Sequence, residues 1–203
     1  MTAHEQHTDD HSDIRDAVAK LCAQFPGEYW RKLDRQMAYP KEFVDALTEA
    51  GYLSVLIPEE YGGSGLGLAE ASVIMEEINR AGGNSGACHG QMYNMGTLLR
   101  HGSEEQKAQW LPRMTTGEAV GCFGLTEPNH GSDPGSMVTR AKKVDGGYRL
   151  SGSKMWITNS PIADVFVVWA KDDAGEIRGF VLEKGWEGLS APTIHGKVGL
   201  RAS

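Results

Sequence analysis

The stretch GCFGLTEPNHGSD, residues 121–133, marks the point where this sequence changes from a helical to a β pattern, and KMWITN follows it at residues 154–159. Before residue 117, apolar side chains recur at the spacing of one helix face. After it, short runs of β-forming residues alternate with turn sequences. The change predicts an α+β fold. The expected divisions are a disordered tail at 1–12, an all-helical domain at 13–117 and an incomplete, antiparallel, β-barrel-like domain at 118–203.

The helical half carries sequence signals for where helices begin and end. Gly51 follows an apolar stripe and is expected to end that helix as its C′ glycine. Ser103 and Gln106 have the spacing of a capping box at a helix start. Apolar periodicity over 68–80 and 87–100 predicts two longer helices.

The β half contains five short runs rich in β-forming residues. The sequences DGG at 145–147 and DDAG at 172–175 separate some of these runs and predict tight turns between strands. The expected strands are 139–144, 148–151, 165–170, 177–182 and 189–194.

The charge of the chain limits its partners. The 203 residues carry a formal net charge of -7 and have a pI of about 5.5. An acidic chain does not release counterions from phosphates, so we predict no nucleic-acid partner. An anionic ligand would need a local positive pocket. No apolar run approaches the length of about 18 residues that a membrane span requires, so none is predicted.

The cysteines and the N-terminus indicate the compartment. Cys22, Cys88 and Cys122 are scattered and contain no CxxC pair, so neither a disulfide framework nor a zinc site is predicted. The polar start of the chain has no targeting pattern. These features favour a reducing cytoplasm. Three tail histidines, at 4, 7 and 11, can share a helical face, but a solvated tail explains them better, and we predict no metal.

Two glycine-rich segments superficially resemble nucleotide motifs. In the loop at 62–67, Leu68 stands where a dinucleotide fingerprint would place its third glycine, and helices are expected on both sides. The segment 147–154 ends in Ser-Lys, the reverse of a P-loop, and lies between expected strands. We interpret both as ordinary loops.

The stretch at 121–133 and the KMWITN segment together suggest a ligand site. Phe123–Thr126 reads as the end of a strand, and Pro128 forces a turn after it. Trp156 offers a large π face, and Thr158, two residues later, offers a hydroxyl on the same side of a strand. A planar heteroaromatic ligand with polar edges suits this set. The alternative is that Trp156 fills the core of a barrel, and the residues alone leave both readings open.

The motifs themselves carry a family resemblance. LTEPNHGSDPGSM at 125–137 and SGSKMWITN at 151–159 resemble the acyl-CoA dehydrogenase family. PEEYGGSGL at 58–66 and HGSEEQKAQWLP at 101–112 extend the resemblance over nearly the whole chain. The β region is especially similar to glutaryl-CoA dehydrogenases.

The resemblance implies an FAD site and a role for each residue in it. The backbones of Phe123 and Leu125 are expected to contact the flavin ring, together with the backbone and hydroxyl of Thr126. Trp156 is expected to pack against the ring, and Thr158 to bond its edge.

The resemblance also implies a reaction and partners. The intact protein is expected to carry out FAD-dependent α,β-dehydrogenation of an acyl-CoA thioester to the 2-enoyl-CoA. Ser132 is expected to contact the thioester end or the pantetheine arm. The implied electron acceptor is an electron-transferring flavoprotein, and the implied full-length assembly is a homotetramer.

The sequence departs from the family pattern in its length. The family places its catalytic glutamate in a C-terminal four-helix domain, which we expect to be absent from this chain. Neither Glu59 nor Glu127 matches that base, and Glu127 is interpreted as loop structure. No catalytic residue is therefore assigned, and the chain alone is expected to be inactive.

A second departure concerns the acyl group. Glutaryl-CoA dehydrogenases carry an arginine for the distal carboxylate, but GGNSGACHG at 82–90 contains none, which favours an uncharged acyl group. Two other functions stay open at this point. One is a truncated, non-catalytic remnant or interaction module, and the other is a flavin-dependent oxidase or monooxygenase of the same fold.

Overall fold

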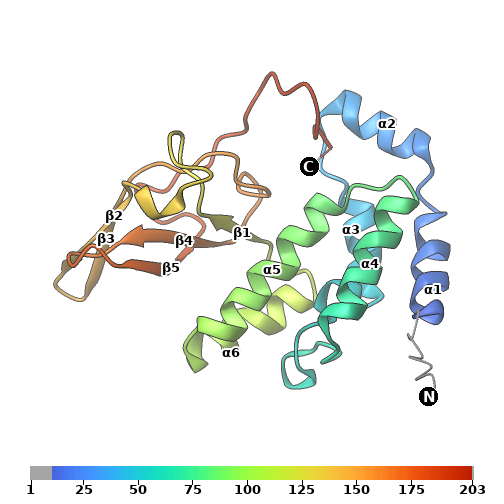
Figure 1. The fold of residues 1–203 in the computed structure, drawn as a ribbon, viewed down its shortest axis with the longest axis horizontal. Coiled ribbons are helices and arrows are strands. Elements are labelled where there is room, and N and C mark those ends of the chain that lie inside the picture. Colours follow the sequence, from blue (N-terminus) through green and yellow to red (C-terminus); the bar gives the residue numbers. More distant parts are fainter. Residues whose placement is uncertain (1–10, 203) are drawn as a thin grey trace, which may run out of the picture.

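The computed structural model describes residues 11–202, in which a layer of helices stands beside an open sheet (Figure 1). The predicted tail at 1–12 lies almost wholly outside these residues, as do His4 and His7, although Ser12 already belongs to the first helix. No helix of residues 11–202 is long and apolar enough to cross a membrane. The α-helices are α1 (Ser12–Cys22), α2 (Gly27–Gln36), α3 (Lys41–Glu49), α4 (Leu68–Arg80), α5 (Ser85–His101) and α6 (Glu104–Thr115).

The predicted helix signals act as expected. Gly51 adopts a left-handed conformation with φ 77° directly after α3. The Ser103 hydroxyl accepts a hydrogen bond from the Gln106 N–H at 3.2 Å, and the Gln106 amide oxygen accepts one from the Ser103 N–H at 3.0 Å. These bonds confirm the capping box at the start of α6. Short 3₁₀ turns occupy Tyr52–Ser54, Glu59–Tyr61 and Pro134–Ser136.

The sheet has five strands and is mixed, not wholly antiparallel as predicted. The two hairpins, β2–β3 and β4–β5, are antiparallel, whereas β1 and β2 each pair with β4 in parallel. Turn sequences specify only hairpins, so they could not show that β1 crosses over to meet β4. The strands are β1 (Gly121–Gly124), β2 (Arg140–Val144), β3 (Gly147–Ser151), β4 (Val165–Lys171) and β5 (Ile177–Glu183).

The strand predicted at 189–194 does not form. This segment is irregular and leaves the sheet. Pro192 lies within it and lacks the N–H that a central strand would need. The chain then crosses to the helical layer, where the guanidinium of Arg201 pairs with Asp34 of α2, and the Asn84 side chain donates to the Ala202 carbonyl at 2.8 Å (Figure 1).

Helices α5 and α6 join the two layers. Their buried side chains pack with Val165 and Val167 of β4 in one apolar cluster, which includes Leu111 and Met95. The approach is close at Gly121, where a Cβ would lie 2.7 Å from Met114 Cε and 3.0 Å from Asn94 Cβ. A glycine at this position therefore lets the helices press directly on β1. A separate cluster, around Val18, Phe43 and Ile78, forms the core of the helical layer.

We expect Leu111→Ala to lower the free energy of unfolding by about 2–5 kcal/mol, because it leaves a cavity where the helices meet the sheet. Leu111 is fully buried, whereas Leu68 is 77% exposed. Leu68→Ala is therefore the matched control and should change stability by less than about 0.5 kcal/mol. Urea denaturation followed by circular dichroism compares them. Equal losses would contradict this account of the junction.

Candidate functional site

The outer edge of β1 has no partner strand among residues 11–202. The Val120 carbonyl accepts from Val165 N–H and so faces β4, whereas the Gly121 N–H faces the other way and donates to the Gln91 side chain. Backbone direction alternates along a strand, so the backbone of Phe123 also faces away from β4. No strand of residues 11–202 pairs with this edge. The Phe123 carbonyl accepts from the Leu125 N–H at 3.2 Å, so the Phe123 N–H is the group that this part of the edge offers to a ligand.

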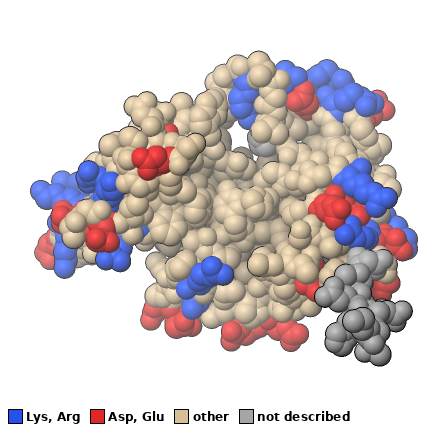
Figure 2. All heavy atoms as spheres, in the orientation of Figure 1, with Lys and Arg blue, Asp and Glu red and all other residues tan. Residues whose placement is uncertain are grey.

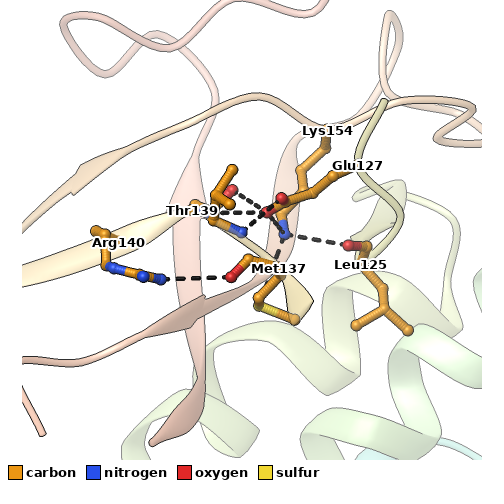
Figure 3. Close-up of polar contacts among 7 residues, drawn as sticks. Leu125, Glu127, Met137, Thr139, Arg140 and Lys154 are labelled. Atoms are coloured by element: carbon orange, nitrogen blue, oxygen red, sulfur yellow. Dashed lines mark hydrogen bonds and ion pairs between the residues drawn. The ribbon is translucent and has the colours of Figure 1, made fainter. Parts of the chain in front are cut away.

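A buried carboxylate holds the loop that follows β1. Glu127 is 2% exposed, and its carboxylate accepts hydrogen bonds from the N–H groups of Val138 and Thr139, at 2.7 and 2.9 Å, and from the Thr139 hydroxyl. The Lys154 ammonium lies 2.9 Å from it and also donates to the Leu125 carbonyl at 3.1 Å (Figure 3). Lys154 therefore ties the end of β1 to the KMWITN segment.

The hydrogen bonds on Glu127 fix its charge. Burial alone would raise the pKa of this carboxyl, but the bonds from the Thr139 hydroxyl, Val138 N–H, Lys154 and Thr139 N–H together lower the pKa to about 2. Its lone pairs are occupied and its basicity is low. These contacts agree with the interpretation of Glu127 as loop structure.

The KMWITN segment is a loop, not the strand that the sequence suggested. The Met155 N–H donates to the Thr126 carbonyl at 2.9 Å, and the next residue, Trp156, takes a left-handed conformation with φ 62°. That conformation is uncommon for a bulky residue and persists only where neighbouring contacts impose it. The Trp156 side chain is 63% exposed, so it does not fill a barrel core.

A cavity of about 720 Å³ lies between this loop, the α2–α3 connection and the C-terminal segment. Figure 2 shows the molecule hollowed beneath the C-terminal segment, near the top of the view. Trp156, Thr158 and Asn159 line it on one side. Asn159 also has a left-handed backbone, and its buried amide oxygen finds no hydrogen-bond partner within residues 11–202.

Helix α5 supports both halves of this site. At Gly90 a Cβ would lie 3.3 Å from the Asn159 amide nitrogen and 3.6 Å from Thr158 Cγ2, so a small residue lets the loop pack closely. One turn further on, the ring of Tyr93 meets the ring of Phe123 edge to face, with centroids 5.3 Å apart.

A basic face continues from this site along the sheet. Register places Arg140 opposite Lys171 and Lys142 opposite Arg149, all on the face that also carries Phe123 and faces α5 and α6. Like charges directly opposite each other destabilise a sheet. Within residues 11–202 none of these four cations forms an ion pair, and Figure 2 shows Lys and Arg gathered at this end of the sheet, on the left, beside acidic turn residues.

The structure thus places the predicted site residues around one region. Phe123, Leu125 and Thr126 form the outer edge of β1 and its end, and Trp156 and Thr158 lie on the loop bonded to it. Ser132 is on the exposed loop between Glu127 and β2. The sequence reasoning missed Lys154 and Gln91, because their partners are distant backbone groups that no local pattern reveals.

Comparisons with known proteins show the family of this chain. Residues 8–118 match the model of the acyl-CoA dehydrogenase N-terminal domain, and residues 122–203 match that of the acyl-CoA dehydrogenase middle domain. The chain belongs to the acyl-CoA dehydrogenase family. The resemblance found in the sequence motifs is therefore confirmed, as is the α+β fold class.

Alignment with individual acyl-CoA dehydrogenases shows what share of each relative's length this chain covers. The mitochondrial isovaleryl-CoA dehydrogenase of Solanum tuberosum is 39% identical over 203 residues, which cover 96% of this chain and 49% of that protein. A glutaryl-CoA dehydrogenase from Mycobacterium smegmatis, solved in complex with FADH2, matches with a TM-score of 0.89 and 36% identity over 96% of this chain and 50% of that one.

A third match comes from the structure described as the electron transferring flavoprotein of Acidaminococcus fermentans. Its chain matches with a TM-score of 0.88 and 32% identity, over 98% of this chain and 54% of that one. The chain therefore spans about half the length of the acyl-CoA dehydrogenase relatives that it matches.

Glu127 should make stability depend on acidity. Its pKa of about 2 in the folded chain lies below the ordinary value of 4.5, so its contribution is complete above about pH 5 and is lost as pH falls towards 2. We expect Glu127→Gln to lose up to roughly 3 kcal/mol at neutral pH and to show a flatter decline below pH 5. Urea titrations across this range measure both effects. Parallel pH profiles for the two proteins would contradict the assignment.

Proposed function

We propose that the whole protein catalyses the FAD-dependent α,β-dehydrogenation of an acyl-CoA thioester to the 2-enoyl-CoA, and that this chain supplies the flavin and thioester side of the site. One observation carries the proposal. The unpaired edge of β1 is held against the exposed Trp156 loop by Lys154, which bonds both the Leu125 carbonyl and the buried Glu127.

The residues present fit a flavin. Trp156 and Thr158 line the cavity with Asn159, whose buried amide oxygen has no hydrogen-bond partner within residues 11–202. An exposed indole held in an unfavourable backbone conformation lowers the stability of the fold, and a planar ligand that covers the indole can offset this loss. A tricyclic ring with alternating donors and acceptors along its edge satisfies these groups.

Each residue then has a role in holding the reactants. The backbones of Phe123 and Leu125 and the backbone and hydroxyl of Thr126 contact the flavin ring, while Trp156 packs on its face and Thr158 bonds its edge. When bound, FAD supplies the acceptor for the hydride that leaves the β-carbon. A strand edge fixed by buried bonds holds the Phe123 N–H in place without reorganisation, and a donor held in this way stabilises charge that develops during the reaction.

No residue of this chain is assigned as the base that removes the α-proton. A general base needs a free lone pair and a pKa near the working pH. Glu127 has neither, because donors surround it and its pKa is about 2. Ser132, on the exposed loop before β2, instead contacts the thioester end or the pantetheine arm.

The basic face suits the rest of the substrate. Coenzyme A carries phosphate groups, and the cations Arg140, Lys142, Arg149 and Lys171 begin where the Ser132 loop ends. An acidic chain needs such a local positive surface to bind an anion. The two like-charge pairs cost stability in the free sheet and are relieved when phosphates lie between them.

The acyl group itself is uncharged in this proposal. The segment 82–90, at the start of α5, contains no arginine or lysine to meet a distal carboxylate. The potato relative is named for isovaleryl-CoA, whose acyl group is uncharged.

We further propose that an electron-transferring flavoprotein accepts the electrons and that the full-length protein is a homotetramer. The cytoplasmic location stays a prediction, since that relative is mitochondrial.

The proposal is tested on the full-length protein loaded with FAD. We expect isovaleryl-CoA or butyryl-CoA, added anaerobically, to bleach the visible flavin band, and glutaryl-CoA to bleach it far less. An electron-transferring flavoprotein should then restore the band faster than dioxygen does. Failure to bind FAD would favour the non-catalytic alternative. Faster reoxidation by dioxygen would favour an oxidase.

The basic face gives a separate expectation. We expect the double variant Lys142→Gln, Arg149→Gln to weaken acyl-CoA binding by roughly tenfold, since charge-assisted bonds to phosphate are lost, and to reduce the salt dependence of binding. FAD binding should not change. The control, Lys143→Gln with Lys20→Gln, removes the same charge away from this face. Isothermal titration at two salt concentrations measures binding, and equal loss in both variants would contradict the assignment.

A further inference from the structure

The Gln91 side chain lies where the helical layer meets β1. Gln91 is in the middle of α5 and is only 5% exposed. Its amide nitrogen donates to the carbonyl of Met114, in the last turn of α6, at 3.2 Å, and to the carbonyl of Ala119, in the connection to β1, at 2.8 Å. Its amide oxygen accepts from the Gly121 N–H, the first of β1, at 2.8 Å. One side chain thus bonds three successive parts of the chain.

The orientation of this amide is set by its partners. The nitrogen faces two carbonyl oxygens and the oxygen faces one N–H, so the reversed amide would place donor against donor and acceptor against acceptor. Both N–H donors are used. An apolar side chain in this position would remove the Gln91 bonds to the Ala119 carbonyl and the Gly121 N–H, whereas the Met114 carbonyl would keep its bond from the Gly117 N–H.

The bond to Gly121 bears directly on the ligand edge. Gly121 and Phe123 face the same way from β1, so the amide that holds Gly121 lies beside the backbone that Phe123 presents. The absence of a Cβ at Gly121 leaves α5 in direct contact with the strand. From the same helix, Tyr93 packs on the Phe123 ring and Gly90 admits Thr158 and Asn159.

We propose that Gln91 is a positioning residue for the flavin site, which sets the distance between α5 and the Phe123–Thr126 edge without touching the flavin itself. The inference rests on the proposed function, because it concerns the site assigned there to FAD. A side chain that only satisfied buried carbonyls would contribute to stability alone. A positioning side chain also determines how well the edge meets the ring.

The test uses the full-length protein and compares Gln91→Leu with Met92→Ala. Met92 is the next residue of α5 and is buried, but it packs in the helical core away from β1, so its truncation lowers stability without disturbing the edge. FAD dissociation constants and visible flavin spectra are measured for both, with the unfolding of each apoprotein. We expect Gln91→Leu to weaken FAD binding by roughly tenfold or more and to shift the flavin band, and Met92→Ala to do neither.

A second variant tests the proposal if Gln91→Leu does not fold. In Gln91→Glu, the protonated carboxyl can donate to one carbonyl and accept from Gly121, but the ionised form places a charge against two carbonyl oxygens. FAD affinity of this variant should therefore rise at low pH and fall as pH rises, relative to the wild type.

Two results overturn the inference while leaving the proposed function intact. One is wild-type FAD affinity and spectrum in Gln91→Leu, or a loss no greater than that of Met92→Ala. The other is a Gln91→Glu variant whose FAD affinity follows the wild type at every pH. Failure of the wild-type protein to bind FAD would instead overturn the proposed function, and the inference with it.

Discussion

The carboxylate of Glu127 is the group on which the candidate site depends. It is buried in a turn and is stabilised there by backbone N–H groups of Val138 and Thr139 and by the Lys154 ammonium. A buried charge is tolerated only when such partners surround it, and removing one of them leaves the charge uncompensated. The requirement to satisfy this one charge therefore holds together the end of β1, the start of β2 and the loop that carries Trp156. The neighbouring segments gain fixed positions from a residue that has no chemical role of its own.

Helix α5 supplies the second constraint, because it touches both sides of the site. Gly90 allows close packing against Thr158 and Asn159, Gln91 bonds the backbone at Gly121, and Tyr93 packs on Phe123. Through these contacts the packed helical layer restricts the motion of β1 and of the loop that carries Trp156. A ligand edge supported in this way loses little freedom when the ligand binds, which is the general advantage of a preorganised site. The basic face extends the same side of the sheet, and its four cations form no ion pair with any residue of 11–202, a departure from stable pairing that is typical of functional surfaces.

Much of the local structure followed from particular residues. Gly51 and the Ser103–Gln106 pair act where predicted, and the hairpins at 145–147 and 172–175 form as their turn residues indicate. The predictions failed where the cause was not local. The parallel pairing of β1 with β4 depends on a crossover over some forty residues. The left-handed backbone of Trp156 opposes its intrinsic preference, and it directly follows the bond from the Met155 N–H to the distant Thr126 carbonyl. The run at 189–194 has β-forming residues but no strand beside it to pair with.

The amino-acid sequence by itself determined the helical and β halves of this chain and its family, since periodicity, turn chemistry and motif spacing are properties of neighbouring residues. Tertiary structure alone decided that Trp156 is exposed, that Lys154 and Gln91 bond distant backbone groups, and that Arg140, Lys142, Arg149 and Lys171 share one face. The physical reason is that burial, charge pairing and strand register are set by which segments meet across the fold. The hydrogen bond between residues 91 and 121 cannot be predicted from the residues that flank position 91 or position 121 in the sequence.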